Sequence, residues 1–202
     1  MSEEAQRWAA NGMRNPIVPS IFAKRTPSTT LLIWRNGWLT TPYLLFCEGR
    51  STGGLLVGAS INQAPELFKM AVLGVPFVDV VPTVIDASIP LTAVEWEEWG
   101  CPNEEKFVDY MMECSPVNNV KAGAKNPACL LTGGLHDPRV QFWEPSKFAA
   151  TLRYTQSDDS GPVCVKVDMA AGHFSASNRY KYYKKLAFDY AFLLDQVGLA
   201  DK

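Results

Sequence analysis

A serine flanked by glycines is the first feature of the sequence that could do chemistry. Ser51 lies between Gly49 and Gly53 in the stretch CEGRSTGGLLVG, and a further glycine follows directly. Glycines at this spacing favour a backbone that a side chain would obstruct, as where a strand turns sharply into a helix and lifts a serine hydroxyl out of the fold. A glycine-rich turn without chemistry gives the same pattern, so other residues must decide between the two interpretations.

Residues that could activate Ser51 follow two later apolar runs. The segment GGLHDPRV comes after ACLLT and contains Asp137, and DMAAGHFSAS comes after VCVKV and contains His173. A serine hydroxyl becomes a useful nucleophile when an imidazole accepts its proton and a buried carboxylate orients that imidazole. The chain order Ser51, Asp137, His173 is the order found in α/β hydrolases.

Alternatives for the acid and the base remain open on these grounds alone. The chain has two histidines, and His136 would have to share one loop with its orienting neighbour, which is sterically unfavourable. His173 is therefore the preferred base. Asp79, which follows the second apolar run, competes with Asp137 as the acid, whereas Asp168 lies at the end of a strand in the loop of His173 itself.

These candidates require a sheet that brings them to one edge. Apolar runs predict four strands, at Tyr43–Cys47, Met70–Val75, Ala128–Thr132 and Val163–Val167. Helices are predicted at Thr52–Phe68, with Pro65 breaking it late, at Asn103–Cys114, at Glu144–Tyr154 and from about Asn178 to Val197. Strands separated by helices indicate an α/β fold, a parallel sheet with helices on both faces. In such a sheet functional groups gather after the carboxyl ends of the strands.

The first 37 residues follow a different pattern, with three prolines, basic and hydroxyl residues and no sustained period. A short helix from Ser2 to about Ala10 is the only element predicted there. We expect residues 1–37 to be a separate, unassigned segment and the α/β domain to comprise residues 38–202.

Composition excludes several functional classes. The 19 Lys and Arg are offset by 21 Asp and Glu, which argues against nucleic acid as a partner. The acidic start lacks a secretory signal, and no apolar run approaches the ~20 residues that span a membrane. Five widely spaced cysteines without a C-x-x-C motif predict reduced thiols in a cytoplasmic protein, and neither a metal nor a cofactor is expected.

Five segments together carry a resemblance to a known family: EGRSTGGLLVG, FKMAVLGVPFVDV, SIPLTAVEWEEWGCPNE, LLTGGLHDPRVQFWEPSKF and AGHFSASNRY. From about Leu39 to Val197 the chain resembles the C-terminal part of the catalytic domain of prolyl oligopeptidase-family serine peptidases. The resemblance implies a partial α/β-hydrolase fold. It also implies the following roles: Ser51 as nucleophile, Asp137 as orienting acid, His173 as base, the Thr52 amide as an oxyanion donor and Arg139 as a ligand of a substrate carbonyl.

The acidic stretch around Trp96 bears on specificity. Taken alone, Glu95, Glu97 and their neighbours are typical of a solvated face. The family resemblance implies instead that Glu95 and Glu97 bind the basic side chain before the cleaved bond, because a guanidinium needs carboxylate partners. Trp96 and Trp99 would supply apolar walls. Short basic peptides are thus the expected substrates.

Compared with complete family members, the chain is expected to lack the β-propeller and the first strands of the hydrolase sheet, together with an upstream tyrosine that gives a second oxyanion donor. The strand nearest that break is expected to expose unpaired backbone. Two alternative functions follow. The chain could be a weakly active or inactive fragment that associates, for example as a homodimer through the exposed sheet edge, or another α/β hydrolase such as an esterase or acylaminoacyl peptidase.

Overall fold

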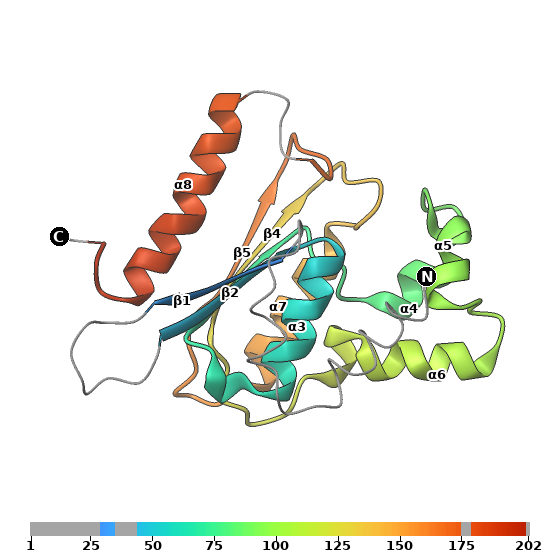
Figure 1. The fold of residues 1–202 in the computed structure, drawn as a ribbon, viewed down its shortest axis with the longest axis horizontal. Coiled ribbons are helices and arrows are strands. Elements are labelled where there is room, and N and C mark those ends of the chain that lie inside the picture. Colours follow the sequence, from blue (N-terminus) through green and yellow to red (C-terminus); the bar gives the residue numbers. More distant parts are fainter. Residues whose placement is uncertain (1–28, 35–43, 175–178, 201–202) are drawn as a thin grey trace.

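A five-stranded sheet forms the centre of the protein (Figure 1). The structure, a computed structural model, describes residues 29–34, 44–174 and 179–200. The strand order is β1-β2-β3-β4-β5; β2 to β5 run parallel, and β1 pairs antiparallel with β2. The strands are β1 (Thr29–Trp34), β2 (Leu44–Arg50), β3 (Met70–Gly74), β4 (Ala128–Gly134) and β5 (Val163–Asp168).

Helices connect the parallel strands, and one more helix follows the last strand. They are α3 (Thr52–Gln63), α4 (Val80–Ile85), α5 (Thr92–Trp99), α6 (Glu105–Cys114), α7 (Trp143–Thr155) and α8 (Arg179–Gln196), with 3-10 turns η1 (Pro65–Leu67) and η2 (Pro116–Asn119). The predicted parallel sheet and its crossover helices are confirmed, and α3 ends just before Pro65, as predicted. The short helices α4 and α5 were not predicted.

The two faces of the sheet are covered by different helices. Neighbouring residues of a strand point to opposite faces and therefore pack against different helices. Cys47 on β2 belongs to the main core, which α3 and α7 close on one face. Phe46, the preceding residue, packs with Met70 and Ala128 on the other face, where α8 contributes Phe192 and Leu193. Figure 1 shows α8 on the opposite side of the sheet from α3 and α7. The predicted arrangement of helices on both faces is thereby confirmed.

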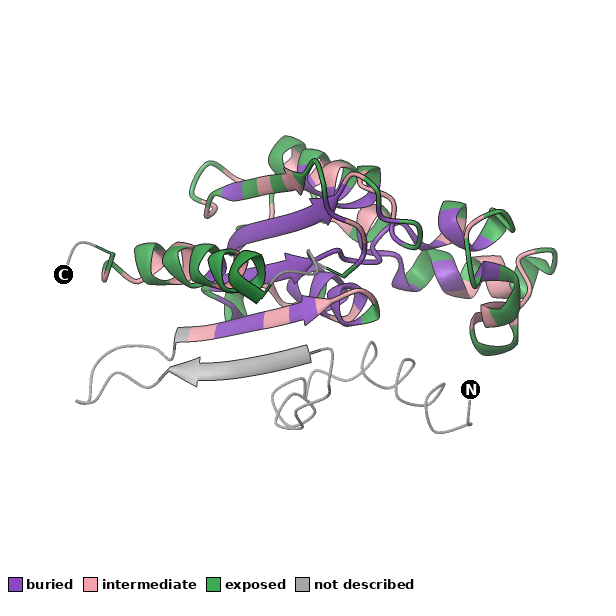
Figure 2. Ribbon diagram, turned by 90° about the horizontal axis from the view of Figure 1, so that it is seen from above, coloured by how far each residue is buried: buried purple, intermediate pink, exposed green. Residues whose placement is uncertain are grey.

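Burial falls from the centre of the sheet to its β5 edge (Figure 2). Every residue of β3 and β4 is buried, whereas β5 alternates between buried and exposed positions. Central parallel strands are covered on both faces, and their sequences are therefore nearly continuous apolar runs. On α8 only Asp189 is buried. Within the described residues, no helix has the length and apolarity required to cross a membrane.

The strand β1 corrects two expectations. It lies in the segment for which no strand was predicted, and by pairing with β2 over six residues it covers the backbone that was expected to be unpaired. A segment of six residues of mixed hydroxyl and apolar type is too short to show a strand period, so β1 could not be predicted from its pattern. The helix expected from Ser2 to Ala10 and the domain boundary after residue 37 lie outside the described residues.

The packing of α7 on the sheet yields a stability prediction. Phe148 is 0% exposed and belongs to the main core, whereas Tyr154, on the same helix, is 91% exposed. Phe148→Ala should lower the free energy of unfolding by about 3–5 kcal/mol because it leaves a cavity. Tyr154→Ala should change it by less than about 0.5 kcal/mol. Urea denaturation of both variants checks this, and comparable losses would contradict the placement of α7.

Candidate active site

Ser51 stands at the turn between β2 and α3 in a strained conformation. Its backbone has φ 55° and ψ −124°, a positive φ that is uncommon for a residue with a side chain. The Ser51 amide donates to the Gly74 carbonyl at 3.0 Å, and the Ser51 carbonyl accepts from the Gly54 and Phe77 amides at 2.8 and 3.0 Å. Hydrogen bonds at both the amide and the carbonyl of Ser51 thus fix the turn to the end of β3 and to the segment that follows it.

Close backbone contacts explain the glycines around Ser51. A Cβ atom on Gly49 would lie 2.1 Å from the carbonyl oxygen of Gly53, and one on Gly54 would lie 2.4 Å from Cβ of Pro76. Neither position has room for a side chain. Of the two interpretations of the motif, the structure supports the sharp strand-to-helix turn. Thr52 is the first residue of α3, and amides of a first helical turn have no acceptor within the helix.

Asp137 and His173 form a buried acid–base pair after the ends of β4 and β5. His173 Nδ1 and Asp137 Oδ2 are 2.8 Å apart, and the side chains are 8% and 0% exposed. The other carboxylate oxygen, Oδ1, accepts the amides of Arg139 and Val140 at 2.9 and 3.0 Å. Burial tends to raise the pKa of Asp137, but these hydrogen bonds outweigh it and hold the pKa below its usual value.

The competing candidates have other partners. Asp79 forms an ion pair with Lys147 on α7. Asp168 is exposed, and its Oδ1 accepts the amide of Ala170 at 2.9 Å. The His136 side chain is exposed, and its amide donates to the Ala171 carbonyl. The structure therefore brings His173 together with Asp137 and with none of the alternatives.

Ser51 and the acid–base pair lie at the same edge of the sheet. Arg50 and Gly74, which end β2 and β3, pair with each other, and Gly74 pairs with Thr132. The strands β4 and β5 end two residues further along, where Gly134 pairs with Asp168. The Arg50 guanidinium, one residue before Ser51, lies 3.5 Å from the His173 carbonyl. Within the described part of the chain, Ser51 Oγ and the His173 imidazole are not hydrogen-bonded to each other. The roles of Ser51, Asp137 and His173 as a triad stay a prediction.

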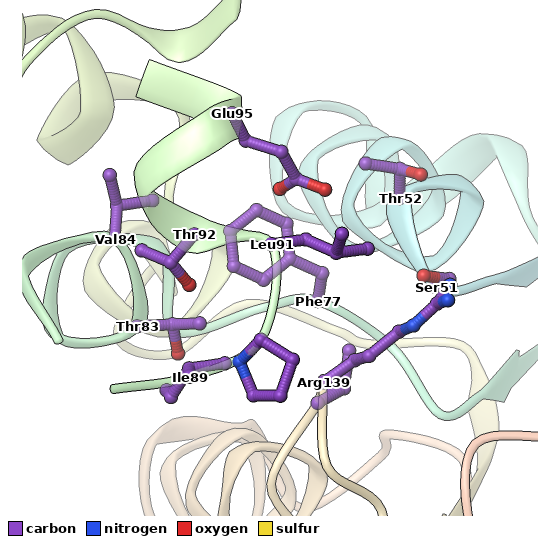
Figure 3. A pocket seen from close by; sticks show the side chains of 12 residues that line it. Ser51, Thr52, Phe77, Thr83, Val84, Ile89, Leu91, Thr92, Glu95 and Arg139 are labelled. Atoms are coloured by element: carbon purple, nitrogen blue, oxygen red, sulfur yellow. The ribbon is translucent and has the colours of Figure 1, made fainter. Parts of the chain in front are cut away.

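A pocket of about 190 Å³ opens beside Ser51 (Figure 3). Glu95 reaches into it from α5, and Arg139 extends from the loop after β4 toward Ser51. The remaining lining is Thr52, Phe77, Thr83, Val84, Ile89, Pro90, Leu91, Thr92 and Val140. Four of the five proposed site residues outside the acid–base pair, namely Ser51, Thr52, Glu95 and Arg139, thus share one pocket.

The electrostatics of the pocket centre on Glu95, which is half-buried. Burial and the charge of Glu98 raise the pKa of Glu95 above its usual value, while Arg139 and a hydrogen bond from Trp99 act in the opposite direction. A cation entering the pocket would favour the ionised carboxylate. The Arg139 guanidinium lies over the Phe174 ring, 5.4 Å from its centroid, and its side chain is exposed.

Glu97 is not brought into this pocket. It is exposed, and it is not among the lining residues. Residues two apart on a helix do not share a face, so on α5 Glu95 and Glu97 cannot act as a pair of neighbouring carboxylates. Its role as a ligand of a basic side chain stays a prediction without geometric support.

The apolar walls also differ from those expected. Trp96 and Trp99 pack behind the pocket in a cluster with Phe77, and Trp96 Nε1 donates to the Val84 carbonyl at 2.9 Å. The tryptophans thus support the wall and do not line it. Phe77 and Leu91 were missed as lining residues because their positions depend on α4 and α5, for which the sequence shows no clear helical period.

A strained serine turn, a buried Asp–His pair and an adjoining pocket at one edge of a parallel sheet are typical of serine hydrolases with an α/β fold. Comparison with known proteins identifies the family. The model of the prolyl oligopeptidase family matches residues 30–200, so the chain belongs to this family. The match begins before residue 38; the predicted boundary there stays a prediction.

Individual relatives agree with this assignment. "Protease 2" of Moraxella lacunata is 48% identical over 199 residues, which are 98% of this chain and 28% of that protein. "Dipeptidyl aminopeptidase BI" of Pseudoxanthomonas mexicana is 47% identical over 76% of this chain and 21% of its own length. The chain therefore spans between a fifth and a third of the length of these relatives.

Solved structures show the same fold. Oligopeptidase B from Leishmania major matches with a TM-score of 0.72 and 50% identity over 77% of this chain and 21% of that one. Oligopeptidase B from Trypanosoma brucei with covalently bound antipain matches with a TM-score of 0.71 and 55% identity, over 76% and 21%. The predicted partial α/β-hydrolase fold is confirmed, and the chain is similar to oligopeptidase B.

The low pKa of Asp137 predicts a pH-dependent contribution to stability. A carboxyl whose folded-state pKa lies below its unfolded value stabilises the fold above the unfolded pKa of about 3.9 and loses that contribution as the pH falls through the folded value. Asp137→Asn should therefore lower the free energy of unfolding by about 1–3 kcal/mol at pH 7, with a smaller difference from wild type below about pH 4.

Urea denaturation from pH 7 to pH 3 measures this difference. Asp158→Asn, which changes an exposed aspartate, is the matched control and should stay close to wild type throughout. A difference between wild type and Asp137→Asn that is the same at every pH would contradict the assigned cause of the pKa shift.

Proposed function

We propose that this chain forms the C-terminal part of the catalytic domain of a serine peptidase that hydrolyses short peptides after Arg or Lys. The observation that carries the proposal is the pocket that Ser51 shares with Glu95 and Arg139, at the same sheet edge as the bonded pair Asp137–His173. The similarity to oligopeptidase B and to the named peptidases supports the reaction class.

In the proposed reaction the acid–base pair activates the serine. Asp137 holds Nδ1 of His173 at 2.8 Å, which leaves Nε2 to accept the proton of Ser51 Oγ. The alkoxide attacks the peptide carbonyl, His173 returns the proton to the departing amine, and water then hydrolyses the Ser51 ester with His173 again as base. The Thr52 amide, free at the start of α3, would donate to the oxyanion.

Selectivity would come from Glu95. The pocket volume of about 190 Å³ is below the ~300–1,000 Å³ typical of whole small-molecule ligands and suits a single side chain. Its apolar wall would contact the methylene stem of an Arg or Lys side chain, and the Glu95 carboxylate would bind the charged end. Arg139, exposed at the rim, would bind a carbonyl of the substrate backbone.

The nucleophile assignment can be tested with a fluorophosphonate probe, which reacts with activated serines. The purified 202-residue protein should be labelled at Ser51, and Ser51→Ala should abolish labelling, because the probe needs the hydroxyl that His173 deprotonates. Intact-mass analysis gives the site and its stoichiometry. Chromogenic substrates with Arg, Lys, Pro and simple acyl esters then define the reaction.

The outcomes separate the alternatives. Ser51-dependent turnover of acyl esters with indifference to charge would favour an esterase or acylaminoacyl peptidase. A folded protein that shows no labelling, and that sizing chromatography finds as a dimer, would favour an association role. Such association would use β1 or β5, the edge strands of the described sheet.

The pocket assignment predicts that Glu95→Gln raises KM for an Arg substrate roughly 10- to 100-fold with little change in kcat, because one charge-assisted contact is lost in the ground and transition states alike. A neutral substrate should be affected much less. Glu97→Gln is the matched variant on the same helix and should have the smaller effect.

For wild type, KM for an Arg substrate should rise as the pH falls through the pKa of Glu95, since only the ionised carboxylate attracts the guanidinium. An equal loss toward neutral substrates would contradict this pocket model.

We also place the protein in the cytoplasm. All five cysteines are free thiols in the structure, and three of them, Cys47, Cys114 and Cys129, are buried. Burial raises the pKa of Cys129 to about 12 and that of Cys114 to about 11, so both thiols stay protonated and unreactive. Unpaired thiols of this kind favour a reducing compartment.

A further inference from the structure

Glu144 is a buried carboxylate that the reaction scheme does not use. It lies at the start of α7 and is 0% exposed. Oε2 accepts the amides of Val78 and Asp79, each at 3.0 Å, and Oε1 accepts the Thr83 hydroxyl at 2.8 Å. All three donors belong to the segment that follows β3. Glu144 thus joins α7 to that segment by three hydrogen bonds.

The segment held by Glu144 forms one side of the pocket. Phe77, Thr83 and Val84 line the pocket, and the Phe77 amide donates to the Ser51 carbonyl at 3.0 Å. Trp96 Nε1 donates to the Val84 carbonyl, which ties α5, the helix of Glu95, to the same wall. A displacement of residues 77–84 would therefore move both the backbone that supports Ser51 and the helix that presents Glu95.

Glu144 also lies close in sequence to the acid loop. Val140, which lines the pocket and donates its amide to Asp137 Oδ1, is four residues earlier. His173 is bonded to Asp137, which lies seven residues before Glu144 in the sequence. Glu144 in turn binds the amide of Val78, and the neighbouring Phe77 amide binds the Ser51 carbonyl. Glu144 thus joins α7, which follows the acid loop, to the pocket wall, beside the ion pair of Lys147 with Asp79.

Keeping a carboxylate at this buried position has an electrostatic cost. Burial raises the pKa of Glu144 to about 7, and the nearby carboxylate of Asp79, paired with Lys147, acts in the same direction. Ionisation of Glu144 is thus costly in this site, and well-packed apolar side chains often stabilise a fold at least as well as buried charges do. An apolar residue would leave the Val78 and Asp79 amides without an acceptor and the Thr83 hydroxyl unrestrained.

We propose that Glu144 is a positioning residue, which fixes the wall formed by residues 77–84 so that the pocket beside Ser51 can hold a basic side chain. This role rests on the proposed function. It predicts that loss of Glu144 reduces selectivity for Arg over a neutral side chain, beyond any loss of folded protein.

Two measurements on the 202-residue protein test this role. The first compares the rates at which Ser51 reacts with two phosphonates that differ only in carrying an Arg or an Ala side chain. Glu144→Ala should lower the Arg-to-Ala rate ratio roughly tenfold, since small misplacements of binding groups have large kinetic effects. A ratio of rates is insensitive to the fraction of folded protein. Glu66→Gln, an exposed glutamate in η1, is the control and should keep the wild-type ratio.

The second measurement is amide hydrogen exchange, which requires no reaction at Ser51. Glu144→Ala should speed exchange in residues 77–84 and leave β3 and β4 protected. Should Glu144→Ala fail to fold, Glu144→Gln keeps one carbonyl for the two amides and should show the same changes to a smaller degree. Thr83→Val removes the hydroxyl from the other side and should lower the ratio more than Thr83→Ser, which keeps it.

Each outcome decides. An unchanged rate ratio in Glu144→Ala and Thr83→Val, or exchange that rises uniformly over the sheet, overturns the positioning role and leaves the proposed function intact. Wild-type protein that shows no Ser51-dependent reaction overturns the proposed function and the positioning role with it. A lower ratio together with local exchange in residues 77–84 supports the proposal.

Discussion

The turn between β2 and α3 depends on backbone contacts that leave no space for a side chain at Gly49 or Gly54. Contacts of 2.1 and 2.4 Å to the ideal Cβ positions show that α3 and the loop after β3 pack directly against the backbone. The positive φ of Ser51 persists because hydrogen bonds to Gly74 and Phe77 fix the residue from both sides. The turn places Ser51 at the sheet edge where the loops after β4 and β5 carry Asp137 and His173.

The loops at this edge are held by buried polar groups in addition to apolar packing. Asp137 binds His173 and two amides of its own loop, and Glu144 binds two amides and a hydroxyl of the neighbouring one. Hydrogen bonds to a buried carboxylate are directional, so Asp137 and Glu144 add a defined position to loops that also carry buried apolar side chains such as Phe77 and Val78. The two carboxylates each accept three hydrogen bonds, but their pKa values move in opposite directions. Hydrogen bonds outweigh burial and lower the pKa of Asp137, whereas burial outweighs them and raises the pKa of Glu144.

The sequence predicts the parts of the fold whose signal is local. Strands such as Ala128–Gly134 are continuous apolar runs because helices cover both faces of the sheet, and each parallel strand was found close to its predicted range. The positions of Ser51, Asp137 and His173 after successive strands follow from the same pattern. The short elements gave no such signal: β1 is six residues long, and α4 and α5 are stabilised by packing on one another. The expected pairing of Glu95 with Glu97 stays a prediction without geometric support, because residues two apart on α5 do not share a face. Glu144 was missed because its partners, two backbone amides and the Thr83 hydroxyl, are distant in sequence.

The two apolar clusters belong to different parts of the protein. The main core joins the sheet to α3 and α7, whereas the cluster around Phe77, Val80 and Met111 joins α4, α5 and α6 to one another. In Figure 2 these three helices extend to one side of the sheet. Substitutions in the second cluster can therefore reshape the pocket without disturbing the strands that present Ser51, Asp137 and His173. Glu144 and Lys147 on α7 are polar links between the two parts, because they bind Val78, Asp79 and Thr83. The geometry of the pocket relative to Ser51 therefore depends in part on these bonds, and specificity in such a domain can change when they are altered.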